Sequence, residues 1–291
     1  MKIATYNIDG LPETLDLNNL PWIFKPAVWI YKLFAGTTLI HLNDNTGRSE
    51  DTKKISKYLQ QFDIVGIQED FNYHNELKSS LQDKNWGTFQ GAIDFSKIFS
   101  MVKWFRYKSD GLNIITNSQI TILEEDIVEW KNSCGYFSHC NDKLTRKGFR
   151  RYLLKDGKTG YKFIVYVLHA DASEDLDDVR DSNTRRKQFT QLTDYMKSRK
   201  ETHPILIIGD TNCADTEMDN ETISDYLMFP LEDGSTTIDQ VLPNTDLDRV
   251  FVVNSPLYDS KIIVNSCEHG IEGLSDHRPF IVDFDVVSRH V

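Results

Sequence analysis

The chain has 291 residues, of which 40% are hydrophobic and 26% are charged, and this composition is typical of a folded globular protein rather than a fibrous or disordered one. Its 44 Asp and Glu against 33 Lys and Arg give a net charge of −11. General nucleic-acid binders usually carry a basic surplus, because neutralising phosphate supplies most non-specific affinity. The acidity lowers the expectation of a nuclease without removing it, since a bound metal reverses the local field.

The first residue, Met1, is followed at once by a strand-like segment, so no signal peptide is visible. We expect a cytoplasmic protein, or a secreted or periplasmic one if a leader has been removed. The longest apolar stretch, residues 20–42, is interrupted by Pro and Lys and is a poor bilayer-spanning candidate. The cysteines lack the paired spacing of a zinc site; Cys134 and Cys140 are close enough for a disulfide, and free thiols are an equal alternative.

Short apolar runs rich in Ile and Val predict buried strands. They are residues 2–8, 64–68, 111–116, 163–169, 205–209, 249–253 and 280–284. Helical periodicity appears at residues 50–61 and 180–197. No internal repeat or linker is visible, so we expect one catalytic domain over residues 1–291, with a two-sheet core flanked by helices.

Polar side chains stand at the ends of these predicted strands. They are Asn7, Glu69, His169, Asp210, Asn212, Asp248, Asp276 and His277. A purely structural protein has no reason to place carboxylates, amides and imidazoles at so many strand ends, whereas an active site on a rigid scaffold does.

The acidic and amide residues suit a phosphate-processing metal site. Glu69 follows a buried strand, and a fixed carboxylate suits Mg²⁺, although a helix-capping acid is the plain alternative. Asp210 and Asn212 follow a strand and a Gly, so both can point into one cleft. There Asp210 can orient a water and Asn212 can contact a phosphoryl oxygen or a metal, although the pair alone could form a simple turn.

Two histidines add proton-transfer groups. His277, beside Asp276, can act as a general base, and His169 can protonate a leaving oxygen or stabilise phosphoryl charge. Asp248 can fix the tautomer of such a histidine. The sequence contains no nucleophile elbow, no P-loop and no dinucleotide fingerprint. Metal-assisted attack of water on phosphorus is therefore the simplest reaction that uses all these groups.

The ordered motifs resemble the endonuclease/exonuclease/phosphatase superfamily over residues 3–284. They are Thr5-Tyr-Asn-Ile, Gly66-Ile-Gln-Glu69, His169, Gly209-Asp-Thr-Asn212, Asp248 and Ser275-Asp-His277. The resemblance implies the pancreatic-deoxyribonuclease-like fold, of class α/β (α+β): a four-layered α/β sandwich with two central mixed β-sheets flanked by helices. Each motif alone is weak, but the six in this order are specific.

The same resemblance implies a divalent-metal-dependent phosphodiesterase that uses Mg²⁺, with Mn²⁺ or Ca²⁺ as alternatives. Asn7 and Glu69 would form the metal site, with Glu69 as the principal ligand. Asp210 would orient or activate the water, and Asn212 would contact the phosphate.

The histidines also receive roles from the resemblance. His169 would contact the scissile phosphate and assist the leaving group. His277 would be the general base, with Asp248 or Asp276 supporting it.

Family members act on DNA, RNA, inositol phosphates or sphingomyelin, and two features favour the sphingomyelinase-like branch. The segment 142–149 is similar to the Lys-Gly segment of sphingomyelinases, so we expect Lys147 to contact substrate. Arg185 and Gln188, after His169, also resemble that branch. The long β-hairpin that secreted bacterial sphingomyelinases use at membranes is not evident in the sequence.

Two aromatic inserts offer another route to a lipid surface. Residues 20–34 and 95–107 mix aromatic side chains with lysines, and Trp22, Trp29 and Trp104 suit a bilayer interface. Packing against the core, or a lid, is an equal alternative for both inserts.

We therefore expect a monomer with phospholipase-C-like action on a sphingomyelin-type membrane lipid. A nuclease or a phosphatase of sugar or inositol phosphates is the enzymatic alternative, with nucleic acid the less favoured substrate, and an inactive binding module is the alternative from another class.

Overall fold

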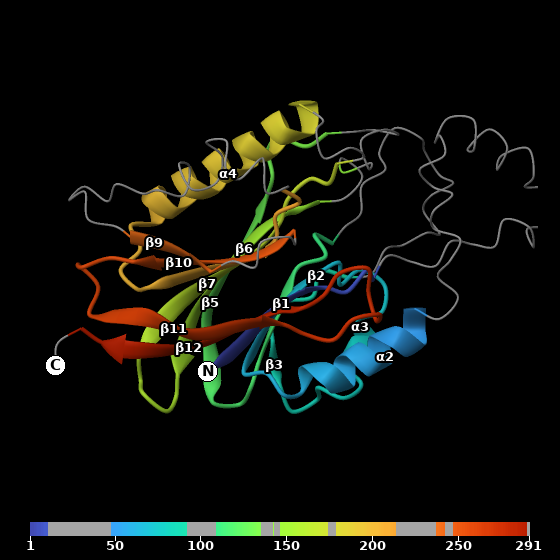
Figure 1. Ribbon diagram of the computed structural model, residues 1–291, viewed down its shortest axis with the longest axis horizontal. Helices are drawn as coiled ribbons and strands as arrows, with labels where there is room; N and C mark the ends of the chain where they lie inside the picture. Colours follow the sequence, from blue (N-terminus) through green and yellow to red (C-terminus); the bar gives the residue numbers. More distant parts are fainter. Residues whose placement is uncertain are drawn as a thin grey trace, which may run out of the picture.

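A computed structural model describes residues 1–10, 48–91, 109–134, 142, 146–173, 179–213, 237–241 and 247–289. In this part of the chain, two six-stranded mixed sheets lie one on the other, and helices cover their outer faces (Figure 1). The predicted four-layered α/β sandwich is confirmed.

The first sheet has the strand order β11-β12-β1-β2-β4-β3. Its strands are β1 (Lys2–Asn7), β2 (Ile64–Gln68), β3 (Asn85–Trp86), β4 (Asn113–Thr116), β11 (Ser260–His269) and β12 (Phe280–Ser288). At its centre β1 is parallel to β2 and antiparallel to β12. The end of β1, the end of β2 and the start of β12 therefore meet at one edge of this sheet.

The second sheet has the order β5-β6-β7-β8-β10-β9. Its strands are β5 (Ile120–Glu129), β6 (Gly148–Asp156), β7 (Lys162–His169), β8 (Ile205–Asp210), β9 (Thr237–Val241) and β10 (Asp248–Asn254). Strand β7 is parallel to β8, and β8 is antiparallel to β10. The register aligns His169 with Asp210 and Asp210 with Asp248, so the three residues form one row across the sheet.

Helices form the outer layers. Helix α2 (Arg48–Leu59) packs Ile55 and Leu59 on the outer face of the first sheet, and the short α3 (His74–Lys78) lies beside it. Helix α4 (Val179–Arg199) covers the outer face of the second sheet, on the opposite side of the molecule in Figure 1. None of the helices in the described ranges is long and apolar enough to span a bilayer.

The alternation of side chains between the two faces of each central strand places a polar cluster between the sheets, at the strand ends. The inward residues of β1, β7, β8 and β10 build the apolar layer between the sheets, for example Ile3, Val167, Ile208 and Val250. Because side chains alternate with period two, the next inward positions at the strand ends are Asn7, His169, Asp210 and Asp248. The apolar layer thus ends in a polar cluster whose backbone is fixed by two sheets.

Candidate active site

Asn7 stands at the centre of the polar cluster and joins the two sheets. Its Nδ2 lies 3.2 Å from Oε1 of Glu69 and 3.1 Å from Oδ2 of Asp210. The side-chain oxygen of Asn7 accepts the backbone N–H of Asp9 at 3.0 Å. Asn7 therefore holds two carboxylates from different sheets close together, one just after β2 and one at the end of β8, with its amide between them.

Glu69 reaches this position through an unusual backbone. It adopts φ 63°, in the left-handed region that L residues rarely occupy, and the turn carries its side chain toward Asn7. Gly10 packs against the carbonyl of this residue, and a Cβ at Gly10 would lie 2.2 Å from that oxygen. Burial raises the pKa of Glu69, although the nearby ammonium of Lys147 opposes the shift.

His169 is buried beside both carboxylates. Its Nε2 lies 3.5 Å from Oδ2 of Asp210 and 4.0 Å from Oε1 of Glu69. Burial lowers the pKa of His169 well below its usual value, and the positive charges of Lys147 and His277 lower it further. The imidazole is therefore neutral at physiological pH.

His277 forms a charged dyad with Asp248. Its Nδ1 lies 2.6 Å from Oδ2 of Asp248, and its Nε2 lies 3.7 Å from Oδ2 of Asp210. Burial alone would lower the pKa of His277, but the carboxylates of Asp210 and Asp248 outweigh it and raise the pKa to about 11. Asp276 is exposed and accepts a hydrogen bond from Ser275, so Asp248 is the acid that orients this ring.

Asn212 and Lys147 meet beneath the cluster. Asn212 Nδ2 donates to the carbonyl of Ala170 at 3.0 Å, and its backbone N–H donates to Oδ1 of Asp210 at 2.9 Å. Lys147 is only 7% exposed, and its Nζ lies 2.6 Å from Asp142 and 3.3 Å from the same carbonyl. Lys147 thus supplies positive charge from below the site and is held there by Asp142.

The oxygen donors of this cluster fit a hard divalent cation. Glu69 and Asp210 present carboxylate oxygens to the same amide group, and burial makes the charged form of Glu69 costly unless a cation stands nearby. In the described ranges, no group of three or more His, Cys, Asp or Glu side chains converges on a metal position. Mg²⁺ commonly takes only one or two carboxylates and fills its remaining positions with water and phosphate oxygens.

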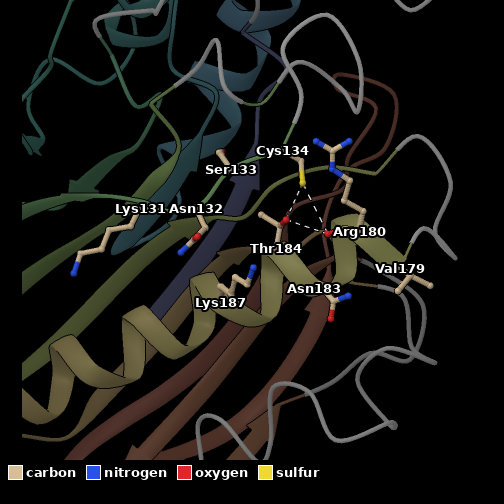
Figure 2. A pocket seen from close by; sticks show the side chains of 9 residues that line it. All are labelled: Lys131, Asn132, Ser133, Cys134, Val179, Arg180, Asn183, Thr184 and Lys187. Atoms are coloured by element: carbon tan, nitrogen blue, oxygen red, sulfur yellow. Dashed lines mark hydrogen bonds between the residues drawn. The ribbon is translucent and has the colours of Figure 1, made fainter.

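A cavity of about 790 Å³ lies away from this cluster, between the segment after β5 and the start of α4 (Figure 2). Its lining residues are Lys131, Asn132, Ser133, Cys134, Val179, Arg180, Asn183, Thr184 and Lys187. It contains none of the predicted catalytic residues. Cys134 is a buried free thiol whose Sγ lies 2.7 Å from Oγ1 of Thr184, and Cys140 lies outside the described residues.

The structure thus brings together Asn7, Glu69, His169, Asp210, Asn212, Asp248 and His277, with Lys147 behind them and Asp276 turned outward. Trp22, Trp29 and Trp104, together with the aromatic inserts that contain them, lie outside the described residues.

Two buried residues near His169 received no role from the sequence, although Asp171 belongs to the His169-Ala-Asp-Ala segment that resembles the sphingomyelinase-like branch. Trp130 Nε1 donates to the carbonyl of His169 at 2.7 Å, and the carboxylate of Asp171 accepts several buried hydrogen bonds. The sequence signal for Asp171 was its position two residues beyond the strand-end histidine.

Comparison with known proteins agrees with this geometry. A model of the Endonuclease/Exonuclease/phosphatase family matches residues 4–277. No curated protein sequence matches the chain significantly.

Four solved structures of three proteins illustrate the shared fold. Staphylococcus aureus beta toxin aligns over 97% of this chain and 99% of its own, with 16% identity and a TM-score of 0.64, and a mutant form with bound magnesium ions aligns with a TM-score of 0.58. D. rerio TDP2 complexed with a single strand DNA product aligns over 98% of both chains, with 15% identity and a TM-score of 0.61. Sphingomyelinase C from Streptomyces griseocarneus aligns over 97% of this chain and 98% of its own, with 16% identity and a TM-score of 0.58. At these identities the likeness establishes the fold alone.

Proposed function

Because the chain belongs to the endonuclease/exonuclease/phosphatase family, we propose that it is a divalent-metal-dependent phosphodiesterase in which water attacks phosphorus. One observation carries the proposal: Glu69 and Asp210 share the amide of Asn7, with His169 and the His277–Asp248 dyad within 4.0 Å of these carboxylates. This set combines cation ligands with proton-transfer groups at the end of a rigid two-sheet core.

Glu69 would be the principal ligand of the cation, and Asp210 the second carboxylate. A cation bound there supplies positive charge to the phosphoryl oxygens and acidifies the attacking water. Magnesium in the beta toxin structure supports Mg²⁺ as the ion to test first. Asn7 donates to both carboxylates, so we assign it the role of holding them in place.

The opposite pKa shifts of the two imidazoles support distinct roles for them. His277, held as an imidazolium by Asp210 and Asp248, donates a hydrogen bond or a proton to a phosphoryl or leaving oxygen. It can accept the proton of water only after positive charge near Asp210 has lowered its pKa. His169 is neutral and can accept a proton, while Asp210 orients the attacking water.

A sphingomyelin-type lipid is the substrate we propose, with phospholipase-C-like cleavage. Sphingomyelinase C among the similar folds supports this choice, as does the Lys-Gly segment at Lys147. Lys147 would act on substrate through its charge, since its ammonium is buried against Asp142.

Three substrates tested in parallel separate the alternatives: sphingomyelin vesicles, a supercoiled plasmid and a soluble phosphate monoester, each with Mg²⁺ and with EDTA. The variants are Glu69→Gln and His277→Ala. Their matched controls are Glu50→Gln, on the surface of α2, and His203→Ala, outside the cluster.

Mg²⁺-dependent loss of sphingomyelin alone, abolished in both site variants and retained in both controls, is the expected result. Nicking of the plasmid without loss of sphingomyelin would indicate a nucleic-acid substrate instead of a lipid. Hydrolysis of the monoester alone would indicate a sugar or inositol phosphate. Full activity of Glu69→Gln in EDTA would overturn the metal-dependent reaction itself.

A further inference from the structure

Three consecutive backbone carbonyls at the end of β7 each accept a hydrogen bond from a side chain. The donors are Trp130 Nε1 to His169 at 2.7 Å, Lys147 Nζ and Asn212 Nδ2 to Ala170 at 3.3 and 3.0 Å, and Arg185 Nη1 to Asp171 at 3.1 Å. All of these side chains are buried. Apart from the bond of 2.9 Å between the N–H of Ala170 and the carbonyl of Asp210 in β8, side chains thus fix this short segment where it leaves the sheet.

Asp171 anchors the far end of the segment through its side chain. Its Oδ1 accepts from Ser133 Oγ and Gln188 Nε2, both at 2.7 Å, and its Oδ2 accepts the backbone N–H of Cys134 at 2.5 Å. The backbone N–H of Asp171 donates to Gln188 Oε1 at 3.1 Å. A fully buried carboxylate that accepts three hydrogen bonds is held in one orientation.

Residues 130–134, here named the strap, carry three of the donors described above, Trp130 Nε1, Ser133 Oγ and the N–H of Cys134, and lie between the active site and α4. Gln188 Nε2 donates to the carbonyl of Asn132, and Gln191 Oε1 accepts the N–H of Lys131. Cys134 contacts Thr184 and the carbonyl of Arg180 in the first turns of α4, as Figure 2 shows. The strap is therefore fastened to α4 on one side and to residues 169–171 on the other.

The ring of His169 depends on this backbone support more than the ring of His277 does. His277 is oriented by the bond between its Nδ1 and Asp248, the usual device for a working histidine. His169 Nδ1 is buried and has no hydrogen-bond partner in the part of the chain that the structure describes. Its Nε2 faces Asp210 and Glu69, so on the Nδ1 side the position of the ring depends on packing and on the backbone that carries it.

We propose that Trp130 and Asp171 are positioning residues that aim the imidazole of His169 at the reaction centre. They act through the strap and the 169–171 backbone, and neither touches Glu69 or Asp210 in any described contact. The kinetic part of the proposal rests on the proposed function, and the structural part does not.

The principal test is Trp130→Phe, which removes the indole N–H and keeps an aromatic ring beside Phe149. Tyr166→Phe is the matched control, because it lies in the same apolar cluster and loses a bond of similar length, to Glu201. With the substrate that the wild type hydrolyses, Trp130→Phe should lower kcat roughly 10- to 100-fold, since small displacements of a catalytic group cost about that much. KM should change less than about twofold, because substrate contacts remain.

A second pair tests the other end of the strap. Ser133→Ala removes the hydroxyl that donates to Asp171, and Ser133→Thr keeps it. Ser133→Ala should lower kcat by about threefold or more relative to the wild type. Ser133→Thr, which keeps the hydroxyl, should have a kcat close to that of the wild type. A rescue by the hydroxyl would not follow if Ser133 only contributed to folding.

A readout independent of activity is the histidine ring ¹H–¹⁵N spectrum of the metal-free protein, assigned with His169→Gln. Trp130→Phe should shift or broaden the His169 ring signals and leave those of His203 unchanged. Unmoved signals, or a kcat loss no larger than that of Tyr166→Phe, would overturn the proposal. If the wild type hydrolyses none of the tested substrates, the spectra still decide it.

Discussion

His277 Nδ1 lies 2.6 Å from Oδ2 of Asp248, and this bond links the two sheets of the sandwich. Asp248 opens β10 in the second sheet, and His277 stands just before β12 in the first. The dyad therefore depends on both sheets keeping their relative position, and it connects the stability of the core to the chemistry of the site.

Replacing Asp248 by Asn tests the charge of the dyad while its shape is kept. Asp248→Asn should lower kcat by about 10- to 100-fold, because the amide no longer stabilises the imidazolium and can favour the wrong tautomer. Steady-state kinetics on the identified substrate checks the prediction, with Asp51→Asn on the surface of α2 as control. Equal activity of the two variants would remove Asp248 from the mechanism.

The raised pKa of His277 predicts a pH-dependent stability of the metal-free protein. With a folded-state pKa of about 11, its protonation stabilises the fold fully below about pH 6.5, the unfolded value, and less as the pH rises toward 11. In EDTA, the thermal midpoint of the wild type should therefore exceed that of His277→Gln most at pH 6, and the difference should shrink by pH 10. A constant difference across this range would contradict the raised pKa.

Cation binding should stabilise the fold through Glu69. A ligand that binds only the folded state adds about 2.7 kcal/mol at about 100 times its Kd. Mg²⁺ should therefore raise the thermal midpoint of the wild type and of Glu50→Gln but not that of Glu69→Gln. An equal rise in all three proteins would place the cation elsewhere.

The sequence located the candidate site residues because the ends of apolar strands are simple to find. Ile- and Val-rich runs predicted the central strands and placed His169, Asp210 and Asp248 at or next to their ends, where the structure brings them together in one row. The six motifs were recognised as one set because their order along the chain resembles the family. The spacing between the residues would not have identified this set by itself.

Five strands lie outside the predicted apolar runs, namely β3, β5, β6, β9 and β11, and among them β5 and β6 have clearly polar patterns. Strand β6 contains Arg150 and Arg151, which are buried because they pair with Asp110 and Glu201 from distant segments. Strand β5, at the sheet edge, is largely solvent-facing and charged. Long-range ion pairs are not visible in a local sequence pattern, so neither strand could be recognised from it.

The left-handed backbone conformation of Glu69 could not be predicted from the sequence either. The close approach of Gly10 to the carbonyl of Glu69 leads to a prediction about Gly10. Gly10→Ala should destabilise the protein by about 1–3 kcal/mol, because its Cβ would lie 2.2 Å from the carbonyl of Glu69 and overpacking costs about that much. Activity should fall as well, since relief of the contact displaces Glu69, the proposed cation ligand. Chemical denaturation and kinetics in Mg²⁺ measure the two effects.

Gly160→Ala separates this effect from the general cost of a lost glycine. Gly160 has φ 78° and nothing within 4 Å of an added Cβ, so the substitution costs backbone strain of about 1 kcal/mol and leaves the site untouched. Gly160→Ala should therefore lose stability and keep full activity, whereas Gly10→Ala should lose both. Full activity of folded Gly10→Ala would mean that Glu69 keeps its place without this contact, and the left-handed turn alone would then position the carboxylate.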